Sequence, residues 1–234
     1  MTDKKPYGKL IGASLGPGDP ELITRRSWAV LQSDARWIYP VKKAEESSYA
    51  LSIVERGGIP RPADAVELVF PMTRDAEVLT KAWVRAAEQT VALLAEGRDL
   101  VFLVEGDAST FATFGHLARV ARELAPEIEV ETIPGVSSFA AAAATTGMPL
   151  AEEDETLAII PAAYGTGVID HMLDEFDTLI LLKVKPLLDE VLELLDRRGA
   201  QLNQFALHPL RGTQGSGTAL CADENKNGTL SLTT

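Results

Sequence analysis

Three short loops of glycine, proline and small polar residues contain the residues most suited to chemistry. The first reads Leu15-Gly16-Pro17-Gly18 and is followed by Asp19-Pro20. Glycine lets the backbone approach a ligand closely, and proline stiffens the loop. The loop is neither a GxGxxG motif nor a P-loop, because the Lys-Ser/Thr pair is missing. Nucleotide phosphates are therefore not its natural ligand, and a rigid strand-to-helix turn is the alternative interpretation.

The second loop follows a strongly apolar run and contains Glu105, Gly106, Asp107 and Thr110. Backbone groups at a tight turn, together with a carboxylate, suit a ribose or a cationic donor group. The alternative interpretation is that Asp107 caps the helix that follows.

The third loop reads Pro134-Gly135-Val136-Ser137-Ser138 and leads into an alanine-rich run at residues 139–146. Small residues after a strand let a helix pack close to a flat ligand. A tightly packed helix with a serine N-cap is the alternative interpretation here.

Strand-like and helix-like runs alternate along the chain, and this alternation predicts an α/β fold with mainly parallel pairing. Asp19 and Pro20 predict the N-cap and first position of the first helix. The ligand site of an open α/β sheet lies beyond the carboxyl ends of its strands, which is where all three loops fall. The predicted strands cover residues 9–15, 35–39, 65–70, 100–104, 128–133, 157–160 and 178–182, and the later helices cover 48–55, 79–94, 111–124, 139–146 and 187–195.

The pattern restarts near residue 130, which predicts two α/β domains, residues 1–130 and 131–234. Residues 211–228 are polar and glycine-rich, and they are interpreted as a loop or disordered tail, with a hairpin turn at Asn227-Gly228 between weak strands as the alternative. This makes residues 211–234 an atypical end for the second domain.

The amino-acid composition limits the partners and the location that can be expected for this protein. The 234 residues carry 22 Lys and Arg against 34 Asp and Glu, so the net charge is −12 and a nucleic-acid partner is not expected. A lone cysteine, Cys221, fits a reducing compartment. The chain has no apolar run of roughly 18 residues and no signal-peptide pattern, which predicts a cytoplasmic protein without a membrane partner. The three histidines are scattered, so no protein-bound metal is expected.

Taken together, the three loops resemble those of the tetrapyrrole (corrin/porphyrin) methyltransferase family. The family's GxGPGDPxLLT pattern corresponds to GASLGPGDPELIT at residues 12–24, its GDP loop to GDA, and its PGxSS segment to residues 134–138. The resemblance implies a two-lobed tetrapyrrole methylase fold, with the active-site cleft between two α/β domains. It also implies an S-adenosylmethionine donor, a precorrin-type tetrapyrrole substrate and a homodimer.

The resemblance also implies which residues act. The donor-binding residues would be Leu15, Gly16, Pro17, Gly18, Gly106, Asp107, Thr110, Ser137, Ser138 and Lys183. Asp107, Glu105 and Tyr39 are the candidate catalytic residues. A substrate with many carboxylates needs local cations in an acidic protein, so Lys42, Lys43 and Arg74 are the candidate substrate contacts. For Lys43, a solvated surface position is an equal alternative.

The segments Tyr39-Pro40, 48–51 and 70–73 resemble the branch of the family that methylates C-20 of precorrin-2, or of cobalt-factor II, in cobalamin biosynthesis. Two departures leave alternatives open. Ala108 and Phe111 stand where the family usually has proline and tyrosine, which predicts a less rigid loop. The family's last strands are not evident in residues 211–234, which indicates divergence or an altered reading frame. The alternatives are another methyltransferase of the family, acting on a different corrin position or on uroporphyrinogen, and a non-catalytic tetrapyrrole- or donor-binding protein.

Overall fold

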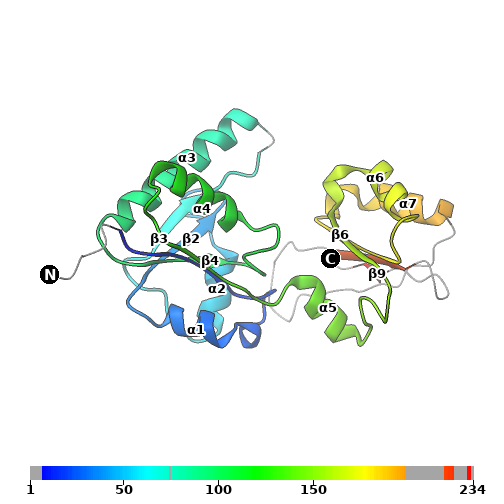
Figure 1. The fold of residues 1–234 in the computed structure, drawn as a ribbon, viewed down its shortest axis with the longest axis horizontal. Coiled ribbons are helices and arrows are strands. Elements are labelled where there is room, and N and C mark those ends of the chain that lie inside the picture. The colour runs from blue at the N-terminus through cyan, green and yellow to red at the C-terminus, as the bar shows by residue number, and fades with distance from the viewer. Residues whose placement is uncertain (1–6, 74, 199–218, 224–230, 233–234) are drawn as a thin grey trace. The chain divides into compact units, whose positions relative to one another are not determined.

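The computed structural model describes residues 7–73, 75–198, 219–223 and 231–232 (Figure 1). The chain divides into two compact units, Met1–Ser137 and Ser138–Thr234. The boundary that the sequence suggests, after residue 130, falls within strand β5 (Val130–Ile133). Because β5 pairs with β1 (Leu10–Ser14), it belongs to the sheet of the first unit.

The first unit is built on a parallel sheet of five strands in the order β3-β2-β4-β1-β5. The remaining strands are β2 (Arg36–Val41), β3 (Val66–Val69) and β4 (Leu100–Val104). All five residues of β4 are buried, as its continuous apolar run predicts for a central strand covered on both faces.

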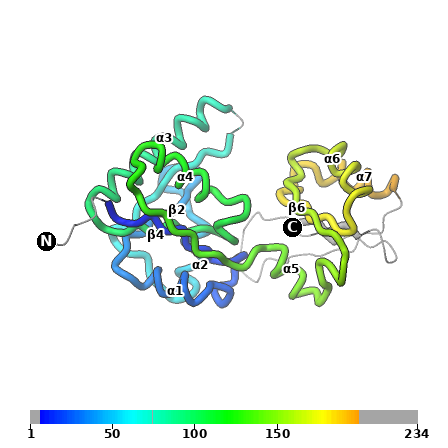
Figure 2. The backbone as a smooth tube through the Cα atoms, viewed as in Figure 1, coloured from blue at the N-terminus to red at the C-terminus, as the bar shows by residue number. Residues whose placement is uncertain are grey.

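Helices cover both faces of this sheet. Helices α3 (Ala76–Leu94) and α4 (Thr113–Leu124) lie on one face, and α1 (Arg25–Leu31) and α2 (Tyr49–Arg56) lie on the other (Figures 1 and 2). Two buried clusters follow from this arrangement. Phe102 packs with residues of α3 and α4, whereas Val101 and Leu103 pack with residues of α1 and α2.

The first predicted helix is in fact two short helices. Asp19 accepts a hydrogen bond from the Glu21 amide and starts a 3-10 helix at Pro20–Leu22, so the predicted cap is confirmed. Ile23 and Thr24 are extended, and the Thr24 hydroxyl then caps α1. A single helix from Pro20 was therefore wrong, because the chain straightens before Arg25.

The second unit has a mixed sheet in the order β6-β7-β8-β9. Strands β6 (Leu157–Pro161) and β7 (Thr178–Leu182) are parallel, whereas β8 (Ala219–Asp223) and β9 (Ser231–Leu232) continue the sheet in antiparallel pairs. The helices are α5 (Ser138–Thr146), α6 (Thr166–Met172) and α7 (Leu188–Arg198), with 3-10 turns at Ala162–Tyr164 and Lys185–Leu187.

The interpretation of residues 211–228 as loop or tail is wrong at β8. Five residues of β8 pair with the whole length of β7, from Thr178 with Asp223 to Leu182 with Ala219. Residues 219–223 thus form a strand because they pair with the buried strand β7, although their own sequence pattern is too weak to predict one. Among the described residues, no helix combines the length and the apolar character needed to cross a membrane.

Candidate active site

The carboxyl ends of β1, β4 and β5 lie next to one another in the first sheet. Ser14 is in register with Val104, and Ala13 is in register with Ile133. The chain leaves β1 toward β2 and leaves β4 toward β5, so the two connections depart in opposite directions. Such a switch point in a parallel sheet opens a crevice for a ligand. The three loops predicted from the sequence begin at this place.

Gly16 and Gly106 join the first two loops through their backbones. Each glycine donates to the other's carbonyl, with N–O distances of 3.1 Å from Gly16 and 2.8 Å from Gly106. Gly16 has a φ of 74° and Gly106 a φ of 75°, and residues with a side chain rarely adopt such positive values. In the described part of the chain, a Cβ added at Gly106 would meet no heavy atom within 4 Å beyond its chain neighbours. The Gly106 backbone is therefore open to a ligand on that side.

The buried Ser14 hydroxyl ties the three strand ends together. It donates to the Ile133 carbonyl at 2.6 Å and accepts from the Ala108 amide at 2.8 Å. Proline at position 108 would have no N–H to donate, so this second bond requires a residue other than proline there. The sequence predicts a less rigid loop because proline is missing, but the structure pins the loop through this hydrogen bond instead.

Gly135 brings the third loop against the other two. A Cβ at Gly135 would lie 2.3 Å from the Ser14 Cβ and 3.0 Å from the Gly106 carbonyl oxygen. The first distance is shorter than two carbon atoms tolerate without a shift of the backbone, so the packing of the three loops requires glycine here.

Asp107 is the polar centre of the cluster. Its Oδ2 accepts from the hydroxyls of Ser109 (2.5 Å) and Thr110 (2.8 Å), and its Oδ1 accepts from the amides of Gly135 (3.2 Å) and Ser109 (3.3 Å). Partial burial raises the pKa of Asp107, but these hydrogen bonds outweigh it, and the net pKa is lowered. The carboxylate is thus ionised at neutral pH. It does not cap α4, whose N-cap is Ala112.

Helix α2 holds the first loop from the other side. The Gly18 carbonyl accepts from the Arg56 guanidinium at 2.7 Å. A Cβ at Gly18, where φ is 134°, would lie 2.4 Å from the Tyr49 hydroxyl oxygen. The sequence does not connect Tyr49 or Arg56 with this loop, because both stand in α2, well separated along the chain from the loop that they support.

Comparison with known proteins identifies the family. The sequence profile described as Tetrapyrrole (Corrin/Porphyrin) Methylases matches residues 9–207. The chain belongs to this family. It is therefore a methyltransferase, and the family resemblance of the three loops is confirmed.

Several known proteins align with about four fifths of this methylase. The cobalt-precorrin-2 C(20)-methyltransferase of Salmonella typhimurium is 35% identical, over 82% of this chain and 79% of its own length. The probable cobalt-precorrin-2 C(20)-methyltransferase of Methanocaldococcus jannaschii is 33% identical, over 81% and 78%. The crystal structure of the methyltransferase CobJ matches 81% of this chain and 76% of its own with a TM-score of 0.55 and 23% identity, which confirms the fold class.

Glu105 and Lys42 of the methylase follow adjacent strands, β4 and β2. Glu105 keeps an exposed surface, but desolvation by the protein around its carboxyl raises the pKa of that group, and the Lys42 ammonium opposes this rise. One candidate catalytic residue and one candidate substrate contact thus follow adjacent strands of the same sheet. Lys43, the next residue, is exposed.

Tyr39 belongs to the buried core of the first unit and not to the three loops. It is 2% exposed, inside the buried cluster on the α1 and α2 face, and the Arg61 guanidinium carbon stands 5.1 Å from its ring centre. Burial raises the pKa of the phenol, with Arg61 opposing, so the hydroxyl remains protonated at neutral pH. The sequence placed Tyr39 at a strand end, whereas β2 continues to Val41.

The other predicted residues fall elsewhere along the chain. Ser137 ends the first unit, and Ser138 opens α5 of the second. Lys183 follows β7 in the second unit, where it is exposed and adopts a positive φ of 59°. Arg74 lies outside the described residues. Donor contact by Ser138 and Lys183, as by the other predicted donor-binding residues, stays a prediction.

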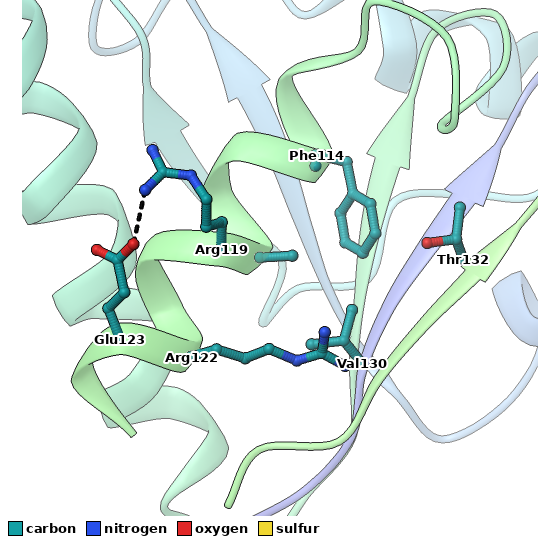
Figure 3. A pocket seen from close by; sticks show the side chains of 8 residues that line it. Phe114, Arg119, Arg122, Glu123, Val130 and Thr132 are labelled. Atoms are coloured by element: carbon teal, nitrogen blue, oxygen red, sulfur yellow. Dashed lines mark hydrogen bonds and ion pairs between the residues drawn. The ribbon is translucent and has the colours of Figure 1, made fainter. Parts of the chain in front are cut away.

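A hollow of about 440 Å³ lies elsewhere on the first unit, between α4 and edge strand β5 (Figure 3). Phe114 and Val130 form apolar walls, and Arg119 is paired with Glu123 at 2.6 Å. None of its lining residues belongs to the three loops. The predicted donor-binding residues therefore lie outside this hollow.

Proposed function

We propose that the methylase transfers a methyl group from S-adenosylmethionine to C-20 of precorrin-2 or of cobalt-factor II, in cobalamin biosynthesis. The observation that carries this proposal is the identity of 33–35%, over about four fifths of the chain, to relatives named as C(20)-methyltransferases. We further propose that it acts as a cytoplasmic homodimer, on the strength of family membership and the acidic, cysteine-poor composition.

The donor would lie against the three loops of the first unit. The open backbone at Gly106, beside Gly16 and next to Pro17 and Gly18, supports this placement. Thr110 completes the hydrogen-bonded turn, and Ser137 and Ser138 continue the third loop. The ionised Asp107 favours a ligand that carries positive charge. Lys183 would contact the donor from the second unit.

The two candidate carboxylates take different roles. Asp107 already accepts four hydrogen bonds, which fills the roughly four lone-pair sites of a carboxylate. Its low pKa also makes it a weak base, so Asp107 positions the loops and supplies charge. Glu105 follows β4 directly, two residues before Asp107, and its raised pKa makes it the better candidate base.

The reaction is a direct displacement. The bound donor supplies a methyl group on a cationic sulfur, so that a C–C bond forms at C-20, the S–CH3 bond breaks and neutral S-adenosylhomocysteine remains. Glu105 would accept the proton that C-20 then loses. Because charge on sulfur disperses in the transition state, alignment and exclusion of water contribute most of the rate. Lys42, Lys43 and Arg74 would bind the carboxylates of the substrate.

The proposal is tested by turnover with methyl-labelled donor and with precorrin-2 or cobalt-factor II under anaerobic conditions. The expected product carries one added methyl group, placed at C-20 by NMR. Label at another carbon would assign the methylase to a different position of the macrocycle. Absence of turnover by the folded protein with both substrates would contradict the proposal and favour a non-catalytic binding role.

A further inference from the structure

The carboxyl edge of the first sheet has two parts. The loops after β4, β1 and β5 form the donor half described above. The loops after β2 and β3 form the remaining half, and β4 borders both. Lys42 and Lys43 follow β2, and Met72, which is 81% exposed, follows β3. This second half presents long cationic and apolar side chains in place of glycine and short hydroxyls.

Phe111 is an unusual residue at the border of the two halves. Its φ is +49°, a conformation that a bulky aromatic residue rarely adopts. It is also 51% exposed, so burial of the ring contributes only part of what a core phenylalanine would gain. Neither the backbone conformation of Phe111 nor the exposure of its ring helps to stabilise the fold. Strain that persists at an exposed residue beside a ligand site indicates a functional role.

The donor loop itself fixes this conformation. The Thr110 amide donates to the Asp107 carbonyl at 3.2 Å, and the Thr110 hydroxyl donates to the Asp107 carboxylate at 2.8 Å. The chain therefore turns back on Asp107 immediately before Phe111. Ala112 and α4 follow directly and hold the other side of the residue. The same carboxylate that joins the donor loops thus also presents the Phe111 ring.

We propose that the exposed Phe111, held in left-handed backbone between the Asp107 turn and α4, packs against the face of the tetrapyrrole macrocycle and positions it for methyl transfer. This inference rests on the proposed function and adds a contact for the acceptor. A conjugated macrocycle offers a flat apolar face that an aromatic ring complements. Met72 supplies a second apolar contact, and Lys42 and Lys43 follow the strand between β3 and β4, where they can bind carboxylate arms.

The test separates the ring from the backbone. Phe111→Ala removes the ring and keeps the strain, whereas Phe111→Gly removes both. Phe111→Tyr keeps an aromatic face, and Leu124→Ala removes an apolar side chain of similar exposure (48%) at the far end of α4. Each variant is titrated with precorrin-2 and, separately, with S-adenosylhomocysteine, and its melting temperature is measured.

We expect both Phe111→Ala and Phe111→Gly to bind precorrin-2 about tenfold more weakly, while Phe111→Gly melts at the same or a higher temperature than the wild type. Phe111→Tyr and Leu124→Ala keep wild-type affinity for precorrin-2, and all four variants keep wild-type affinity for S-adenosylhomocysteine. A protein that becomes more stable but loses the acceptor is not explained by a structural role of the ring.

Two results would overturn the inference, and they are distinguishable. Wild-type affinity for precorrin-2 in Phe111→Ala and Phe111→Gly removes Phe111 from the acceptor site and leaves the proposed function intact. A wild-type protein that binds S-adenosylhomocysteine but neither precorrin-2 nor cobalt-factor II overturns the proposed function and this inference together.

Discussion

The two halves of the first sheet's carboxyl edge are built from different kinds of residue. The donor half is held by short side chains and backbone, with the Ser14 hydroxyl, the Asp107 carboxylate and Gly135 joining three loops within hydrogen-bond or van der Waals reach. The other half, formed by the loops after β2 and β3 and here called the acceptor half, presents long side chains such as Lys42 and Met72. The difference teaches that the fold itself fixes the three loops of the donor half, and under the proposed function recognition of the acceptor would depend on a few side chains that can be exchanged separately.

The largest effect is expected from Gly135→Ala. Its Cβ would lie 2.3 Å from the Ser14 Cβ, so the third loop must move away from the other two. We expect the free energy of unfolding to fall by about 1–3 kcal/mol, the usual cost of overpacking, and donor affinity to fall by at least about tenfold. Urea unfolding and calorimetric titration with S-adenosylhomocysteine measure the two effects.

The matched control is Gly115→Ala. Gly115 lies inside α4, and in the described part of the chain its added Cβ meets no heavy atom within 4 Å beyond its own helix and chain neighbours. Alanine in a helix is favoured over glycine by about 0.5–1 kcal/mol, so this variant should be slightly more stable and bind the donor normally. Equal behaviour of the two variants would remove the requirement for close packing at Gly135.

Asp107→Asn should have the next largest effect. The amide nitrogen of asparagine cannot accept hydrogen bonds from the Ser109 and Thr110 hydroxyls, and the charge that favours a cationic donor is lost. Loss of a charge-assisted hydrogen bond costs about 1.5–3 kcal/mol, so we expect weaker donor binding in calorimetry.

Asp99→Asn is the control for that variant. Asp99 accepts from the Lys9 amide at 2.7 Å, immediately before β4 and therefore at its opposite end. Its donor affinity should match the wild type. If Asp107→Asn also matches the wild type, Asp107 has no part in donor binding.

Lys42→Glu tests the acceptor half by itself. Reversal of one charge should raise the KM for precorrin-2 several-fold and leave donor affinity unchanged, and the effect should shrink in high salt because screening weakens the attraction. Lys81→Glu on α3, where Lys81 pairs only with its helix neighbour Glu77 among the contacts described, should leave KM unchanged. An unchanged KM in both variants would argue against a cationic acceptor half.

The smallest effect is the pH dependence of stability in Glu105→Gln. Folding raises the pKa of Glu105 above its ordinary 4.5, so the protonated form is favoured by folding. Its stabilising contribution is present below pH 4.5 and is lost as pH rises through the folded-state pKa. Glu105→Gln should therefore be more stable than the wild type at neutral pH, by less than about 1 kcal/mol after solvent screening, and the difference should vanish in acid.

The pH dependence of stability that Asp107 contributes has the opposite sign to that of Glu105. Its pKa is lowered from 3.8, so its contribution is present above that value and is lost as pH falls through the folded-state pKa. Thermal unfolding of both variants from about pH 3 to 8 should thus show differences from the wild type of opposite direction. Differences of the same sign would mean that one of the two carboxylates is assigned to the wrong environment.

The sequence predicted the parts of the fold that are determined locally. Strands β4 and β7 have the predicted bounds because their continuous apolar runs suit central positions. The three loops were recognisable because glycine and proline disfavour the interior of a strand or a helix, so their clusters mark where an apolar run ends. Asp19 was correctly identified as a cap because the cap bond spans only two residues.

The features that the sequence missed depend on distant residues. The Ser14 hydroxyl bonds to groups 94 and 119 residues away, and Arg56 reaches the Gly18 carbonyl across 38 residues. Strand β8 forms because β7 offers it a full-length edge, and α6 follows Gly165 at a φ of 90°. No local pattern encodes these pairings, which is why the role of Ala108 became clear only from the fold.

The most direct test of the donor site is calorimetric titration of the full chain with S-adenosylhomocysteine, in parallel for the wild type and Gly135→Ala. We predict micromolar binding at one site per wild-type chain and a clear loss of affinity in the variant. Absence of binding by a folded wild-type protein, or equal binding by the two proteins, would contradict the assignment of the three joined loops as the donor site.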